Sequence, residues 1–246
     1  MKKLEQIKRS YLKNGYAVLK NYISKNLIKE MLADTKKLKE IKKVKKNVFD
    51  VHYLKSGELS SIHNIANYFP KYKKFATKSK IIKVFRAIYG SASNAQYNLS
   101  YFNKPKKKGI ETKIHQDNAY FLLKPAEACT FWIPTCDVTK RNSAMFYYAG
   151  SQKEGLLKHK FNGNPGASLC ISKKIQKKIE KKYKKNFISM KKGDCIIHSP
   201  LVVHGASSNK SSVNRGSFNF NLRSKKANPD RAELIKHNKK LKDRYK

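Results

Sequence analysis

From about residue 95 onward the chain consists of short runs rich in β-branched and aromatic residues, and this pattern constrains the fold more than any other feature. Turn signals such as Lys-Pro, Arg-Asn-Ser and Gly-Asp separate the runs. The runs are AQYNLSYFNK, TKIHQDNAYFLL, EACTFWIPTCDV, AMFYYAG, KNFISMKKGDCIIHSPLVVHG and SFNFNLRS. Several short strands in succession predict a β-sandwich or a barrel over residues 95–223.

The first 90 residues are expected to be mainly helical. Ser24 can cap a helix with the sequence KNLIKEMLADTKKLKEI, in which apolar residues recur at helical spacing. Residues 78–90 predict a second amphipathic helix that ends at Gly90. The stretch NGYAVLKNY predicts a turn followed by one short strand. Within the β-rich part, residues 172–185 predict a lysine-rich surface helix.

The chain is strongly basic, with 56 Lys and Arg against 16 Asp and Glu and a net charge of +40. Such a charge fits a nucleic-acid or anionic membrane partner, or a lysine-rich composition without a specific role. The basic residues are spread along the chain and are not interleaved with aromatic residues or glycines, which favours the second interpretation. An anionic small substrate would still benefit from the positive field.

The chain is expected to form a single domain over residues 1–246, with a basic tail at 224–246 that is helical or frayed. The absence of a CxxC pair argues against a zinc knuckle, and reduced thiols predict a cytoplasmic protein. The basic N-terminus lacks the apolar segment of a signal peptide. No apolar run approaches the roughly 20 residues needed to span a bilayer. The four cysteines are Cys129, Cys136, Cys170 and Cys195.

A pair of metal-capable side chains lies in the run KIHQDN. His115 and Asp117 are two residues apart, so on a strand they project from one face while Gln116 projects from the other. This pair alone is weak evidence. His204 follows a β-branched run and could complete a face of two histidines and one carboxylate. That set suits iron(II) and leaves positions open for a 2-oxo acid and O₂.

Arg215 follows His204 by eleven residues, beyond the turn SSNKSSVN. A hairpin return would place it on the neighbouring strand, where a guanidinium can bind a carboxylate in bidentate fashion. Ser217 faces the same way and could donate another hydrogen bond. Pro200 makes a continuous strand from His198 to His204 doubtful, so we expect His198 to be a core residue or to support the metal ligands.

These segments resemble the phytanoyl-CoA dioxygenase (PhyH) family of iron(II)- and 2-oxoglutarate-dependent oxygenases. The resemblance covers roughly residues 10–223 and rests on KIHQDNAYF, FWIPTCDVTKRNSAMFYYAGSQKEG, KKGDCIIHSPLVVHGASSNKSSVNRGSFNFNL and the opening LKNGYAVLKNYISKNLIKEML. It implies a mostly β fold with flanking helices, namely a double-stranded β-helix, or jelly roll, of the cupin type.

The resemblance also implies roles for individual residues. His115, Asp117 and His204 would be the iron ligands, and Arg215 would bind the distal carboxylate of 2-oxoglutarate. Trp132, Tyr97 and Thr112 would line the co-substrate pocket, although a plain structural role is the alternative for each of these three residues.

The sequence departs from the family pattern in two places. Ser143 and Gln152 stand where the family often has Gly and His, and both changes could alter loops at the substrate entrance. Asp117 argues against the halogenase variants, which leave that coordination position open for chloride.

The resulting hypothesis is a dioxygenase that uses Fe(II), 2-oxoglutarate and O₂ to hydroxylate a small molecule, with release of succinate and CO₂. Two alternatives remain open at this point. One is a β-sandwich binding module without oxygenase activity, and the other is an oxygenase that acts on nucleic acid. The substrate itself cannot be chosen from a family resemblance.

Overall fold

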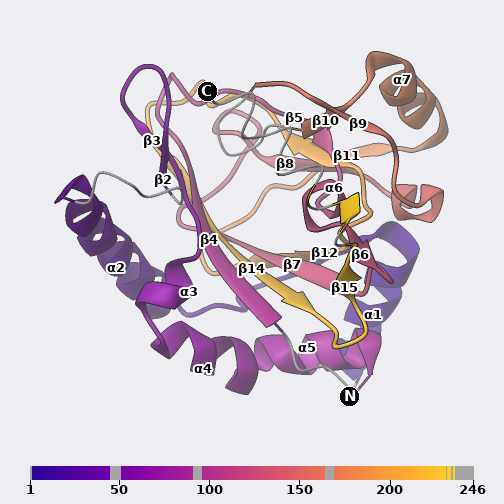
Figure 1. The fold of residues 1–246 in the computed structure, drawn as a ribbon, viewed down its shortest axis with the longest axis horizontal. Coiled ribbons are helices and arrows are strands. Elements are labelled where there is room, and N and C mark those ends of the chain that lie inside the picture. Colours follow the sequence, from indigo (N-terminus) through magenta and orange to yellow (C-terminus); the bar gives the residue numbers. More distant parts are fainter. Residues whose placement is uncertain are drawn as a thin grey trace.

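The computed structural model describes residues 2–44, 51–90, 96–163, 169–230, 232–233 and 235. Two antiparallel β-sheets face each other, and helices cover the outer side of the larger sheet (Figure 1). None of the described helices combines the length and the apolar composition that a membrane crossing requires.

The larger sheet has seven strands, and every neighbouring pair in it is antiparallel. Its long central strands β14 and β4 pair with each other over nine residues each. In spatial order the strands are β1 (Tyr16–Leu19), β12 (Cys195–His198), β7 (Ala128–Pro134), β14 (Arg215–Arg223), β4 (Gln96–Lys104), β3 (Leu59–Ile62) and β2 (Val51–Tyr53).

The smaller sheet has four strands, in the order β11 (Lys185–Phe187), β8 (Met145–Tyr148), β13 (His204–Ala206) and β5 (Thr112–His115). Two separate strand pairs accompany the sheets, β9 (His159–Phe161) with β10 (Leu169–Ile171) and β6 (Leu123–Lys124) with β15 (Asn228–Pro229).

The chain repeatedly crosses from one sheet to the other. It passes from β4 to β5, from β7 to β8, and then from β11 through β12 and β13 to β14, and each of these steps changes sheet. This alternation confirms the predicted double-stranded β-helix, and it means that residues close in sequence face each other across the space between the sheets.

Within the described residues, five helices precede the central strands, and their apolar residues share one core with the outer face of the large sheet. α4 and α5 run along the large sheet in Figure 1. Ile28 of α2 and Phe85 of α5 are fully buried in this core together with Phe218 and Phe220 of β14. The helices are α1 (Lys2–Asn14), α2 (Lys25–Val44), α3 (Ile65–Tyr68), α4 (Lys71–Lys78) and α5 (Lys80–Tyr89).

Several local predictions are confirmed. The Ser24 hydroxyl accepts a hydrogen bond from the Leu27 amide at 3.1 Å, as expected for a helix cap. Gly90 ends α5 with φ of 87°, a left-handed conformation that favours glycine. The predicted surface helix is α7 (Lys173–Lys182), so the prediction over residues 172–185 extended into strand β11.

Other local predictions need correction. The run TKIHQDNAYFLL is not one strand, because β5 ends at His115 and α6 (Asn118–Phe121) follows. The short strand predicted in NGYAVLKNY is β1, which pairs with β12. The hairpin of β2 and β3, which extends the large sheet next to β4, was not predicted. Most of the basic tail lies outside the described residues.

Candidate functional site

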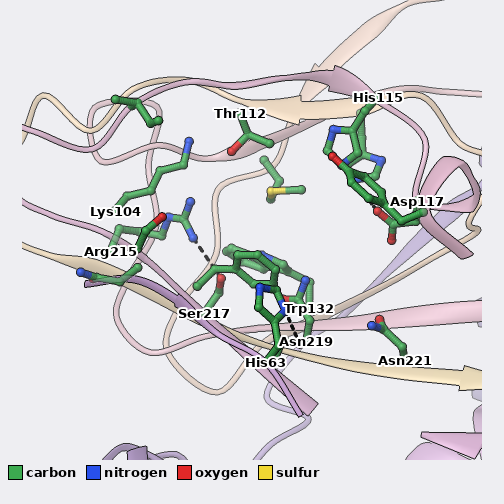
Figure 2. Close-up of a pocket in the computed structure, with 18 of the residues that line it drawn as sticks. His63, Lys104, Thr112, His115, Asp117, Trp132, Arg215, Ser217, Asn219 and Asn221 are labelled. Carbon is green, nitrogen blue, oxygen red and sulfur yellow. Dashed lines mark hydrogen bonds and ion pairs between the residues drawn. The ribbon is translucent and has the colours of Figure 1, made fainter. Parts of the chain in front are cut away.

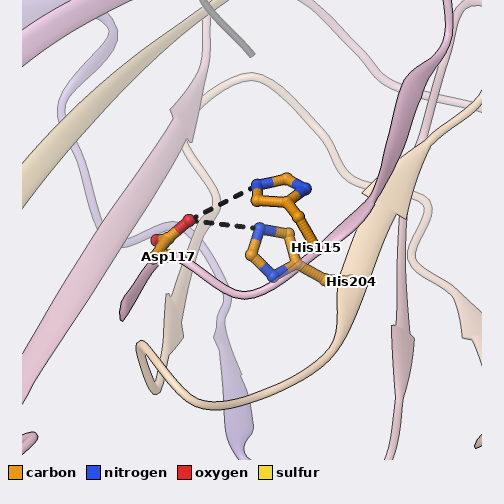
Figure 3. Close-up of side chains that lie close together, drawn as sticks. All are labelled: His115, Asp117 and His204. Atoms are coloured by element: carbon orange, nitrogen blue, oxygen red, sulfur yellow. Dashed lines mark ion pairs between the residues drawn. The ribbon is translucent and has the colours of Figure 1, made fainter. Parts of the chain in front are cut away.

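Three side chains from two distant parts of the sequence meet between the two sheets. His115 ends β5 and His204 begins β13, and the two residues are directly paired across these strands. Asp117 lies at the N-terminus of α6, where the chain turns away from β5. Its Oδ1 atom is 3.5 Å from Nε2 of His115 and 3.5 Å from Nε2 of His204, and all three side chains point to one place (Figure 3).

Backbone carbonyls fix the orientation of both imidazoles. Nδ1 of His115 lies 2.8 Å from the carbonyl oxygen of Lys113, and Nδ1 of His204 lies 3.0 Å from that of Val202. A carbonyl oxygen only accepts, so Nδ1 carries the proton in each ring. The lone pair is then on Nε2, which is the atom turned toward Asp117, as in histidines that bind a metal ion.

The second oxygen of Asp117 is held by neighbours. The Thr130 hydroxyl donates to Oδ2 at 2.7 Å, and Nε2 of His198 lies 3.1 Å from the same oxygen. Oδ1 therefore remains directed at His115 and His204. The predicted role of His198 as a residue that supports the cluster agrees with this contact.

The protonation states suit cation binding. Burial and the neighbouring His115 lower the pKa of His204 to about 3, so its imidazole is neutral at pH 7. Burial alone would raise the pKa of the Asp117 carboxyl, but the surrounding histidines outweigh this effect and hold the pKa well below its usual range. The cluster thus offers the neutral imidazole of His204 and an ionised carboxylate, both of which are good metal ligands.

A cavity of about 300 Å³ connects the histidine–aspartate cluster with a second polar group at its other end (Figure 2). Its walls come from both sheets, with β4, β7 and β14 on one side and β5, β8 and β13 on the other. Cavities of this kind, with a few convergent polar groups, are the usual form of ligand sites.

Arg215 lies at the end of the cavity away from the cluster, and its side chain is a buried cation. Only 2% of the residue is exposed, and Nη1 donates to the Ser217 hydroxyl at 3.0 Å. The guanidinium carbon lies 5.4 Å from the centre of the Trp132 ring. Nε has no hydrogen-bond partner among the described residues. A buried cation with free donors is costly unless an anion binds, so this end of the cavity suits a carboxylate.

Lys104 is a second buried cation beside Arg215, and the sequence analysis did not single it out. It lies directly opposite Arg215 on the paired strand β4, and its Nζ donates to the carbonyl oxygens of Ser207 at 2.8 Å and Ala206 at 3.4 Å. Burial and the nearby Arg215 lower the pKa of Lys104 well below its usual range. A bound carboxylate would relieve the repulsion between the two cations.

The remaining predicted site residues are placed as follows. Thr112, Trp132 and Ser217 line the cavity together with the cluster. Tyr97 belongs to strand β4, but its side chain lies outside the described residues. The expected hairpin between His204 and Arg215 is wrong: β13 belongs to the small sheet and β14 to the large one, so the two residues face each other across the cavity.

The two departures from the family pattern lie elsewhere in the described structure. Ser143 has φ of 76°, a conformation that favours glycine, and its hydroxyl donates to the carbonyl oxygen of Ser207. Gln152 binds the end of α1 through the carbonyl oxygens of Leu12 and Lys13. Neither residue is among the side chains that line the cavity.

Comparison with known proteins assigns the chain to a family. The profile of phytanoyl-CoA dioxygenases matches residues 11–217, which is most of the sequence. The chain belongs to the phytanoyl-CoA dioxygenase (PhyH) family. The residues singled out at both ends of the cavity all lie within this match.

Among the relatives, the peroxisomal phytanoyl-CoA dioxygenase of Bos taurus is 26% identical over 220 residues, which cover 85% of this chain. The enzyme of Homo sapiens is 27% identical over the same length. The chain spans 64% of the length of either protein. A probable alpha-ketoglutarate-dependent hypophosphite dioxygenase of Stutzerimonas stutzeri is 22% identical over 84% of this chain and 74% of that protein.

Solved structures of other proteins share the fold. EctD from S. alaskensis with 2-oxoglutarate and 5-hydroxyectoine superposes with a TM-score of 0.73 at 16% identity, over 89% of this chain and 75% of EctD. The alpha-ketoglutarate-dependent carbocyclase SnoK superposes with a TM-score of 0.72 at 17% identity, over 91% of this chain and 85% of SnoK. At these identities the likeness establishes the fold, while the function has to be argued from the site.

Proposed function

We propose that the protein is an Fe(II)- and 2-oxoglutarate-dependent dioxygenase that hydroxylates a small molecule and releases succinate and CO₂. The observation that carries this proposal is the arrangement within one cavity, with two imidazoles and a carboxylate at one end. At the other end lies a buried guanidinium whose Nε has no partner among the described residues. Membership of the phytanoyl-CoA dioxygenase family supports it.

The donor set fits iron(II). His115, Asp117 and His204 would hold the ion, because their ligand atoms all lie within 4.8 Å of one another and two histidines with one carboxylate form the usual facial set of such enzymes. The bound iron would supply the activation of O₂ that is coupled to decarboxylation of the 2-oxo acid. His198 and Thr130 would keep Asp117 in its binding orientation.

The opposite end of the cavity fits 2-oxoglutarate. Arg215 would bind its distal carboxylate in bidentate fashion, with Ser217 holding the guanidinium and Lys104 adding a second positive charge. Trp132 and Thr112 would enclose the carbon chain between the two ends. The buried setting excludes water from the reacting groups.

The net charge of +40 would attract an anionic co-substrate and favours an anionic substrate. The four cysteines, all within the described residues, form no disulfide. This supports a reducing compartment, so we place the protein in the cytoplasm as a single domain of residues 1–246. The hypophosphite dioxygenase and EctD–hydroxyectoine comparisons support a small-molecule substrate over nucleic acid.

A stoichiometric iron assay combined with 2-oxoglutarate-dependent O₂ uptake and succinate release tests this function. The wild-type protein should bind one iron and consume O₂ only when 2-oxoglutarate is present, while Asp117→Ala should lose both properties. A protein that binds no iron, or an Asp117→Ala variant that releases succinate at the wild-type rate, would leave the non-catalytic binding module as the better description.

A further inference from the structure

The floor of the cavity is a row of polar side chains on strand β14. In this strand Phe218, Phe220 and Leu222 are buried in the core under the helices. The alternate residues project to the opposite side, where Arg215, Ser217, Asn219 and Asn221 line the cavity. This strand therefore combines an apolar outer face with a polar inner face that is directed into the protein.

The neighbouring strand extends the same polar surface. Across the pair of β4 and β14, Asn221 lies directly opposite Asn98, and Asn219 lies directly opposite Ser100. Residues paired in this way on one face have Cβ atoms about 5 Å apart. Asn98 and Ser100 also line the cavity. Three carboxamides and a hydroxyl are thus gathered within reach of a single small ligand.

This polar floor lies beside the metal-type cluster and away from Arg215. Asn221 pairs across β7 with Thr130, and Thr130 is the residue that donates to Asp117. Arg215 is six residues away along β14, or about 20 Å in an extended strand. In Figure 2 Asn221 lies on the side of His115 and Asp117, whereas Lys104 and Arg215 lie on the other. A five-carbon diacid bound at Arg215 is too short to cover Asn221 as well.

The carboxamides have hydrogen-bonding capacity that the protein does not use. Oδ1 of Asn219 and Oδ1 of Asn221 are buried and have no hydrogen-bond partner among the described residues. Buried polar atoms in folded proteins are nearly always paired, so atoms left without a partner in a ligand cavity indicate what the ligand must provide. A carboxamide accepts from O–H and N–H groups and also donates two hydrogens of its own.

The size of the cavity restricts the ligand further. Its volume of about 300 Å³ is at the small end of the range for ligand sites and would be shared with the 2-oxo acid. Apolar side chains such as Leu54, Phe102 and Phe121 form part of the walls, so the polar groups are concentrated on the floor.

We propose that the substrate is a compact polar molecule whose hydroxyl or amino groups bind to Asn98, Asn219 and Asn221, beside the histidine–aspartate cluster. This inference rests on the proposed dioxygenase function and names its substrate class. A long acyl chain has no groups to satisfy these carboxamides, and burying it on them would cost the hydration of all three. The substrate class therefore differs from that named for the phytanoyl-CoA relatives.

The test compares two panels of compounds in a succinate-release assay with the iron-loaded protein. The first panel contains free amino acids, amino alcohols and polyols, and the second contains straight-chain and 3-methyl-branched acyl-CoA esters. Compounds that stimulate succinate release are then titrated with Asn98→Leu and Asn221→Leu, which keep the side-chain size but remove the carboxamide. Asn228→Leu, on the exposed strand β15, is the matched control.

Binding of 2-oxoglutarate is followed separately through the fluorescence of Trp132, which is the single tryptophan of the chain and lines the cavity. Members of the polar panel should stimulate succinate release, and Asn98→Leu and Asn221→Leu should each raise the KM for them by about tenfold. Both variants should keep the Trp132 response to 2-oxoglutarate, and the control should behave as wild type.

The inference is overturned if no polar compound stimulates succinate release, whether or not acyl-CoA esters do. It is also overturned if the two substitutions leave the KM for the polar compounds unchanged. Failure of the dioxygenase proposal is recognised by a different result. In that case the wild-type protein itself shows no Trp132 response to 2-oxoglutarate in the presence of Fe(II).

Discussion

Replacement of Arg215 by leucine should separate ligand binding from fold stability, because this buried residue has no acidic partner among the described residues. In the ligand-free protein the guanidinium is 2% exposed, its Nε has no partner among the described residues, and Lys104 lies opposite it on the paired strand. Replacing such a cation with an apolar side chain is often neutral or stabilising. We therefore expect the unfolding midpoint of ligand-free Arg215→Leu to be equal to or above that of wild type.

The effect on 2-oxoglutarate binding should be large and opposite. Each hydrogen bond to a charged partner contributes about 1.5–3 kcal/mol, so the loss of the guanidinium should reduce the binding free energy by at least about 2.8 kcal/mol, or 100-fold in Kd. At a ligand concentration of about 100 times the wild-type Kd, binding stabilises wild type by about 2.7 kcal/mol and the variant by about 0.4 kcal/mol. For a chain of this size the corresponding shifts in Tm are about 5–11 °C and about 1 °C.

The assay is thermal unfolding under anaerobic conditions with Fe(II), with and without 2-oxoglutarate, so that no turnover occurs. Arg223→Leu is the matched control, because Arg223 lies at the other end of β14 and donates to the Ala227 carbonyl at 3.0 Å rather than lining the cavity. The control should keep the full shift. A full shift in Arg215→Leu would refute the assignment of Arg215 as the carboxylate partner, and a marked loss of ligand-free stability would refute the argument about its burial.

Three further predictions follow from contacts around the cavity. His198→Ala should weaken iron binding by about 10–100-fold in an equilibrium chelator titration, because it removes one of the two groups that hold Oδ2 of Asp117. The affinity for 2-oxoglutarate should fall as pH rises through the lowered pKa of Lys104, since the neutral amine no longer attracts the distal carboxylate. Calorimetric titration of Lys104→Met should show weaker binding without this pH dependence. Asn221→Leu should raise the Tm of the ligand-free protein, because it removes a buried acceptor without a partner, which costs about 1–3 kcal/mol.

The metal-type cluster was predicted from one local pair of side chains and one distant histidine. His115 and Asp117 are two residues apart, and His204 is followed by a glycine in a short β-branched run. The geometry that unites them is different from the expected one, since β5 ends at His115 and Asp117 lies at the start of α6. The two side chains still converge, because the chain turns immediately after the strand.

The position of Arg215 relative to the cluster was harder to predict from the sequence. A sequence separation of eleven residues from His204 to Arg215 fits a hairpin as well as it fits a crossing between two sheets. The choice depends on which strands are neighbours, and that is decided by contacts over long sequence separations, such as the pairing of β14 with β4 and β7. Lys104 carried even less signal, because a single buried lysine cannot be recognised among 56 basic residues.

The polar floor had a signal that the sequence analysis did not use. The run RGSFNFNLR alternates small or amide side chains with Phe and Leu, which alone predicts a strand with one face in solvent. Strand β14 instead lies in the middle of the seven-stranded sheet, and its amide face is directed into the protein. The polar face of an alternating strand in the middle of a sheet must be directed at either water or a cavity. Here the opposing sheet covers this face, so its polar side chains line a cavity.

This arrangement explains how proteins that share one fold can differ in substrate specificity. The metal-type cluster is built at the ends of β5 and β13 in the small sheet, while the amide floor is built on β4 and β14 in the large sheet. Among the described residues, no hydrogen bond joins Asn98 or Asn221 to His115 or His204, so the two sets of side chains are built separately. The substrate class of such a protein is therefore encoded in side chains that belong to no motif, and it has to be derived from the inner face of the large sheet.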